Sequence, residues 1–325
     1  MHQNGDMRIA LALGSGGARG YAHIGVINEL TDRGYDIVGV AGSSMGALVG
    51  GLHAAGKLDE FAHWAGSLTQ RAVLRLLDPS LTSPGVLRAE KILDAVRDII
   101  GDVTIESLPI PYTSVATDLI AGKSVWLQRG QLDDAIRASI AIPGIFTPHV
   151  LDGRLLGDGG ILDPLPMAPI AAVNADLTIA VSLSGADPAA TPLTEPEPSA
   201  TSDRLRRMWR STTALLDTAT AQRVMDSPAA KSVLSRFSSA LDDTADGGEH
   251  AGGGLELPRL GSFEIMNRTI DIAQSALARH MLATYPPDLL IEVPRNACRS
   301  LEYHRAEEVI EIGQELAAAA LDALG

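Results

Sequence analysis

Cysteine is nearly absent from this chain of 325 residues, and its single occurrence, Cys298, excludes a disulfide bond within the chain. Chains with so little cysteine are typical of reducing compartments, which favours a cytoplasmic location. The first six residues are polar and run directly into an apolar segment, which is not the pattern of a secretory signal peptide. No apolar run approaches the roughly 18 residues that a membrane-spanning helix requires.

Positive charge is also scarce, because 26 Lys and Arg stand against 40 Asp and Glu and give a formal net charge of −14. Nucleic acids and anionic membranes are bound mainly by clusters of basic side chains. We therefore expect no nucleic-acid partner and no electrostatic docking on anionic lipid. Any transient contact with a membrane surface would have to be local and apolar.

Aromatic residues make up only 4% of the chain against 46% hydrophobic residues, so the core is expected to be aliphatic. Side chains that ligate metals do not cluster in the sequence at the spacing of known metal sites. Neither a metal nor another cofactor is therefore expected.

What the chain does contain is glycine placed around a serine. A short, largely β-branched run at 37–41 ends in Gly42-Ser43-Ser44-Met45-Gly46, after which small residues continue in a helical pattern. A strand, a sharp turn and a helix around Gly-x-Ser-x-Gly are the context of a nucleophile elbow, where the glycines let strand and helix approach closely. The helix N-terminus would favour negative charge near the serine. Ser44 is thus the predicted nucleophile, although the pentapeptide alone could arise by chance.

A second glycine cluster, GSGGARG at 14–20, follows an apolar run at 8–13 that is predicted to be a buried parallel strand. A dinucleotide-binding loop would need glycine where Arg19 stands, and a Walker loop would end in Gly-Lys-Ser/Thr, which this loop lacks. Apart from a plain tight turn, the remaining interpretation is a nest of backbone N–H groups that binds an oxyanion. Because the serine elbow follows the very next strand, we favour an oxyanion hole formed by the N–H groups of Gly16 and Gly17.

An acidic residue between a strand and two glycines forms the third motif. Asp152-Gly153 predicts a hairpin turn, whose second arm leads to Asp158-Gly159-Gly160. A short acidic side chain flanked by glycines at a strand end can approach a neighbouring serine closely. Taken alone, an Asx turn would explain Asp158 as well.

The motifs at 15–20, 42–46 and 158–160 together resemble those of the patatin-like phospholipase family. The similarity is greatest to its bacterial members related to the esterase domain of neuropathy target esterase. The chain differs from the family's loop pattern at Ser15, where glycine is usual, and a small serine is expected to fit there.

The resemblance implies a catalytic dyad of Ser44 and Asp158, and we expect Arg19 to assist the oxyanion hole. It extends to the run RASIAIPGIF at 137–146, which borders the active site in that family. We assign no catalytic role to this run and interpret Ser139 within it as structural.

The order of the predicted elements indicates an α/β fold with a mainly parallel central sheet sandwiched by helices, as in the patatin-like family. We expect a single domain over 1–325, with a catalytic core at 7–185 and helices and a strand at 263–325 that complete it. Segments 186–202 and 240–254 are rich in small, polar or acidic residues and are predicted to be mobile insertions.

These features predict a serine lipid acyl hydrolase of the phospholipase A or lysophospholipase kind, acting on a lipid or acyl ester through an acyl-enzyme intermediate. Two alternatives stay open. One is a lipid-binding or regulatory protein on the same fold without catalytic activity. The other is a conventional α/β-hydrolase, whose general base would be one of His149, His280 and His304.

Overall fold

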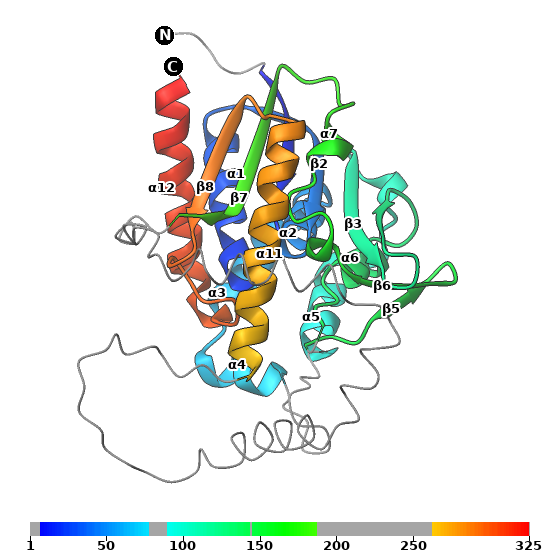
Figure 1. The fold of residues 1–325 in the computed structure, drawn as a ribbon. Coiled ribbons are helices and arrows are strands. Elements are labelled where there is room, and N and C mark those ends of the chain that lie inside the picture. Colours follow the sequence, from blue (N-terminus) through cyan, green and yellow to red (C-terminus); the bar gives the residue numbers. More distant parts are fainter. Residues whose placement is uncertain (1–6, 78–89, 144, 187–261, 325) are drawn as a thin grey trace, which may run out of the picture. The chain divides into compact units, whose positions relative to one another are not determined.

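The computed structural model describes residues 7–77, 90–143, 145–186 and 262–324 (Figure 1). Apart from residue 186, the two segments predicted to be mobile insertions lie outside the described residues. In the described part of the chain, no helix has the length and apolarity that a membrane crossing requires.

An eight-stranded mixed sheet forms the centre of the fold, in the order β5-β6-β3-β2-β1-β7-β8, with β4 also paired to β3. Strands β3, β2, β1, β7 and β8 run parallel to one another, whereas β4, β5 and β6 add antiparallel pairings at the β3 side. The parallel core agrees with the predicted α/β class. The strands are β1 (Arg8–Leu13), β2 (Asp36–Ser43), β3 (Tyr112–Asp118), β4 (Lys123–Leu127), β5 (His149–Leu151), β6 (Arg154–Asp158), β7 (Leu177–Gly185) and β8 (Leu289–Pro294).

Helices cover both faces of the sheet (Figure 1). The α-helices of the described residues are α1 (Ala22–Asp32), α2 (Met45–Ala54), α3 (Leu58–Gly66), α4 (Gln70–Leu77), α5 (Glu90–Ile100), α6 (Leu132–Ser139), α7 (Met167–Ile170), α11 (Ser262–Thr284) and α12 (Ala306–Leu324). Short 3₁₀ turns are η1 (Gly17–Tyr21), η2 (Ile105–Ser107), η3 (Gly159–Ile161) and η4 (Tyr303–Arg305).

Side chains of β1 alternate between the two faces. Ile9, Leu11 and Leu13 belong to a large apolar cluster with residues of α1, α2 and α12. Ala10 and Ala12 belong to a smaller cluster with residues of α7 and α11. Helix α11 lies in front of the sheet in Figure 1. Because both faces of β1 are covered, the strand is apolar at nearly every position instead of alternating with polar residues.

Helix α7 lies in a stretch of the chain that is rich in proline. Only Met167–Ile170 forms a helical turn. Pro164, Pro166 and Pro169 lie in this stretch, and proline has no N–H group with which to continue a helical hydrogen-bond pattern. The predicted hairpin is present, since Asp152 and Gly153 both have positive φ (51° and 73°) between β5 and β6.

The register of the sheet brings the three glycine-containing motifs to one place. Leu13 pairs with Gly42, so the loop after β1 lies beside the elbow after β2. Strand β2 pairs with β3 as far as Ser43, and further along β3 Ala116 pairs with Asp158 of β6. Carboxyl ends of neighbouring parallel strands are a common location for ligand sites in α/β folds.

Candidate active site

Ser44 occupies the turn between β2 and α2 with φ 55° and ψ −122°. A non-glycine residue with positive φ is strained and persists only where its surroundings hold it. A Cβ atom at Gly42 would collide with the carbonyl oxygen of Gly46, and one at Gly46 would collide with that of Leu13. The two glycines therefore permit the close approach of strand and helix that this turn needs.

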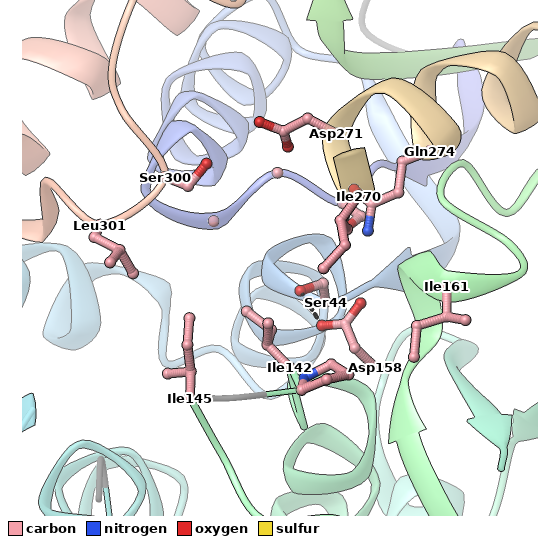
Figure 2. A pocket seen from close by; sticks show the side chains of 14 residues that line it. Ser44, Ile142, Ile145, Asp158, Ile161, Ile270, Asp271, Gln274, Ser300 and Leu301 are labelled. Atoms are coloured by element: carbon pink, nitrogen blue, oxygen red, sulfur yellow. Dashed lines mark hydrogen bonds between the residues drawn. The ribbon is translucent and has the colours of Figure 1, made fainter. Parts of the chain in front are cut away.

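Asp158 lies directly beside Ser44. The Ser44 hydroxyl donates a hydrogen bond of 2.6 Å to Asp158 Oδ2 (Figure 2), and the Gly160 N–H donates one of 2.8 Å to Oδ1. Both carboxylate oxygens thus have a donor, and both side chains are buried, at 1% exposure for Ser44 and 2% for Asp158. Gly159, which lies between Asp158 and Gly160 in the chain, packs so closely on the Val115 carbonyl oxygen that a Cβ atom would collide with it.

Burial changes the proton affinity of this carboxyl group. Desolvation raises the pKa of Asp158 from 3.8 to about 6, while the hydrogen bonds from Ser44 and Gly160 oppose the rise. An aspartate with a pKa near 6 is a better proton acceptor than an exposed one and is still mostly ionised at neutral pH. The pair therefore has the geometry and the charge state to move a proton from a serine hydroxyl.

The glycine loop after β1 reaches the same place. Gly16 and Gly17 line the cavity that contains Ser44 and Asp158. Neighbouring amides of the loop are engaged, since Ser15 N–H donates to the Pro164 carbonyl and Ala18 N–H to the Ser300 carbonyl, but the N–H groups of Gly16 and Gly17 have no partner among the described residues. Two free amide N–H groups at the start of a helical turn can donate hydrogen bonds to an oxyanion.

Arg19, the cationic residue of this loop, is directed elsewhere. Its guanidinium Nη2 forms an ion pair of 3.2 Å with Asp271 Oδ1 of α11, and the residue is 6% exposed. It lines a neighbouring cavity and not the one that contains Ser44. The contact ties the loop to α11, and direct assistance to an oxyanion stays a prediction.

His23 contacts the start of this loop, and no sequence motif indicated that contact. Its Nε2 lies 2.8 Å from the Gly14 carbonyl oxygen, and burial lowers the pKa of the imidazole to about 4. The ring is therefore neutral near pH 7, and with its proton on Nε2 it donates to that carbonyl. A histidine soon after a glycine loop carries no distinctive sequence signal, so only the structure shows this role.

Two cavities meet at Ser44. The first, the catalytic cavity, contains Ser44, Asp158, Gly16 and Gly17. The second, the apolar cavity, shares Ser44 with the first. Its walls are almost entirely aliphatic and aromatic, and they include Leu48, Phe61, Trp64, Ile92, Phe146 and Tyr303.

Part of the catalytic cavity comes from the C-terminal third of the chain. Ile270, Asp271 and Gln274 of α11 line the cavity, as do Ser300 and Leu301, which follow β8 in the chain (Figure 2). Sequence analysis assigned none of these five residues to the site. Their sequence context carries no motif, because they contribute shape and polarity at positions set by the packing of α11.

None of the described histidines lines either cavity that contains Ser44. His149 Nε2 lies 3.0 Å from Asp134 Oδ1. His280 lies on the exposed side of α11, and His304 belongs to η4. Across the residues with defined positions, no group of three or more His, Cys, Asp and Glu side chains is arranged to hold a metal ion.

Comparison with known proteins gives consistent matches. The family model for patatin-like phospholipases matches residues 11–171. An NTE family protein of Mycobacterium tuberculosis is 66% identical over 332 residues, covering 97% of this chain and 92% of its own. The neuropathy target esterase of Drosophila grimshawi is 35% identical over 165 residues, covering 49% of this chain and 11% of its own. A lysophospholipase of Emericella nidulans is 29% identical over 209 residues, covering 62% and 13% respectively.

Proposed function

Because this chain belongs to the patatin-like phospholipase family and is an ester hydrolase, we propose that it cleaves carboxylic ester bonds of lipids with a Ser44–Asp158 dyad. The observation that carries the proposal is the 2.6 Å hydrogen bond from the Ser44 hydroxyl to Asp158 Oδ2 inside a cavity. A nucleophile needs a base within hydrogen-bond reach, and this carboxylate fills that place.

The reaction would proceed in two steps, acylation of Ser44 and hydrolysis of the acyl-enzyme. Ser44 Oγ attacks the acyl carbonyl carbon while its proton passes to Asp158 Oδ2, and the oxygen that becomes negative is bound by the N–H groups of Gly16 and Gly17. The ester C–O bond then breaks, the alcohol leaves with the proton from Asp158, and an acyl-Ser44 ester remains. Water attacks the carbonyl carbon of this ester while its proton passes to Asp158. The bond between that carbon and Ser44 Oγ then breaks, Asp158 returns the proton to Ser44 Oγ, and the fatty acid is released.

The apolar cavity is the proposed site of the acyl chain, because it opens at the nucleophile and is lined by aliphatic and aromatic side chains. Each buried methylene contributes about 0.8 kcal/mol, which corresponds to a factor of about 4 in kcat/KM. With a series of acyl esters that differ only in chain length, kcat/KM should rise by that order per methylene until the cavity is filled. Equal kcat/KM for acetyl and octanoyl esters would contradict this placement.

A matched pair of variants localises the effect. Ile92→Trp narrows the apolar cavity and should shift the preferred acyl chain to shorter lengths. Ile120→Trp makes the same change at a residue that is 81% exposed and should leave the chain-length profile unchanged. In parallel, mass spectrometry of the acids released from phospholipid, lysophospholipid and acylglycerol would identify the substrate, with Ser44→Ala as the blank.

The pH dependence of the reaction follows from the raised pKa of Asp158. The residue accepts a proton only when ionised, so kcat/KM should fall about tenfold per pH unit below pH 6, the value to which burial raises its pKa. Stopped assays from pH 4.5 to 8, with enzyme shown to be folded at each pH, measure this fall in kcat/KM, which is the acid limb of the pH profile. An acid limb centred near pH 4 would contradict the raised pKa of Asp158.

Asp163 offers a control for that measurement. Burial raises the pKa of this carboxyl group to about 6 as well, but Asp163 does not line the catalytic cavity. Asp163→Asn should therefore keep the acid limb of kcat/KM in place. Loss of the limb in this variant would assign it to Asp163 and not to the dyad.

A further inference from the structure

Ser139, the last residue of α6, bridges two backbone groups next to the nucleophile. Its hydroxyl accepts a hydrogen bond of 2.9 Å from the N–H of Ser44 and donates one of 2.5 Å to the carbonyl oxygen of Val115 in β3. The side chain is fully buried. Both hydrogen bonds are therefore shielded from water, and the first one ends on the backbone of the proposed nucleophile.

The same short segment also holds Asp158. Two residues after Ser139, the carbonyl oxygen of Ala141 accepts a hydrogen bond of 3.0 Å from the N–H of Asp158. Ser44 directly follows β2, and Asp158 is the last residue of β6. These two strands do not pair with each other, because β3 lies between them. Residues 139–141 thus link the backbones of the two proposed catalytic residues directly.

The need for such a link arises from the backbone of Ser44. Its φ of 55° is strained, so the turn can relax unless neighbouring groups hold it. Rotation of the backbone at Ser44 would carry Oγ away from Asp158 Oδ2. The hydroxyl of Ser139 opposes that rotation, because it is itself fixed by Val115 and accepts from Ser44 along one direction.

We propose that Ser139 is a positioning residue for the reaction, and that it keeps Ser44 Oγ within reach of Asp158 by binding the Ser44 N–H. The proposal rests on the proposed function, since it takes Ser44 as the nucleophile. It replaces the purely structural role that the sequence suggested for Ser139. It also means that the Ser44 N–H is occupied, which leaves the oxyanion to the amides of Gly16 and Gly17.

Ser114 supplies a matched control. It is a fully buried serine of β3 whose hydroxyl donates a hydrogen bond of 2.9 Å to the carbonyl oxygen of Ala135 in α6 and none to Ser44 or Asp158. Ser139→Ala and Ser114→Ala each remove one buried hydroxyl between the same strand and the same helix. A purely structural role for Ser139 would make the two variants alike in both Tm and turnover.

The experiment compares the two variants by Tm, by kcat and KM for an acyl ester, and by the rate of phosphonylation with a fluorophosphonate. In that last reaction an Oγ–P bond forms, the P–F bond breaks, fluoride leaves and the serine proton passes to Asp158. Ser139→Ala should lower kcat and the labelling rate by about 100-fold with KM changed less than about threefold, the scale of a small misplacement of reacting groups. Ser114→Ala should lower Tm similarly and keep kcat and the labelling rate near those of the wild type.

Wild-type labelling and turnover separate the two proposals. A wild-type protein that neither labels nor hydrolyses esters overturns the proposed function, whereas an active wild type with a Ser139→Ala variant of similar kcat overturns only the positioning role. Where Ser139→Ala does not fold, Ser139→Cys keeps nearly the same shape but has only a weak donor and acceptor. In this variant kcat should fall while KM changes little. Full kcat and a wild-type labelling rate in the cysteine variant would overturn the positioning role in that case.

Discussion

Ser44→Ala is expected to lower ester hydrolysis by roughly 10⁶-fold, the scale of nucleophile loss in serine hydrolases, while leaving the fold intact. The change removes one oxygen atom from a buried side chain and keeps the Cβ atom, so packing around the turn is unaffected. The backbone N–H of residue 44 can still donate to Ser139. Initial rates with an acyl ester, together with the Tm, measure both parts of the expectation.

The neighbouring serine provides the control. Ser43 is also fully buried, and its hydroxyl has no hydrogen-bond partner among the residues that the structure describes. Ser43→Ala should therefore keep turnover within a few-fold of the wild type. Substantial turnover in Ser44→Ala, or an equally inactive Ser43→Ala, would show that the nucleophile has been assigned to the wrong residue.

Asp158→Asn should reduce kcat by about 10²–10⁴-fold, the range that a general base contributes. The amide is nearly the same size as the carboxyl group but cannot accept the proton of Ser44. Alanine at His149, His280 or His304 should each leave most of the activity, because none of these rings lines the cavities that contain Ser44. An inactive histidine variant beside an active Asp158→Asn would instead support a conventional triad.

The same substitution should raise the thermal stability at neutral pH. The folded-state pKa of about 6 lies above the unfolded value of 3.8, so this group stabilises the fold fully only below about pH 3.8, and the contribution is lost as the pH rises through 6. A shift of two pKa units corresponds to roughly 3 kcal/mol at pH 7.5. Asparagine carries no charge to desolvate. The Tm of the Asp158→Asn variant should therefore exceed the wild-type Tm at pH 7.5, and the difference should shrink towards pH 4.

Strong local constraints explain why much of the fold and the site could be predicted. Gly42 and Gly46 mark a turn that no larger residue can make, and the apolar run of β1 marks a strand covered on both faces. After Asp163, three prolines limit α7 to one helical turn.

Other parts of the site depended on long-range packing. The residues of α11 and of 300–301 that line the catalytic cavity belong to no sequence motif. The same is true of His23, which contacts the Gly14 carbonyl of the glycine loop. Ser139 lay in a recognisable run, but its contact with the Ser44 N–H depends on where α6 ends against β3. Such contacts join residues distant in sequence, and no short pattern encodes them.

The sequence by itself determined the chemical types and their local geometry: a serine in a sharp turn, an aspartate before two glycines and a glycine loop after a strand. These follow from steric limits within a few residues, which a sequence expresses directly. Only the tertiary structure decided that Ser44 and Asp158, 114 residues apart, meet at 2.6 Å. The physical reason is the sheet register, since antiparallel pairing of β6 with β3 places the end of β6 beside the end of β2.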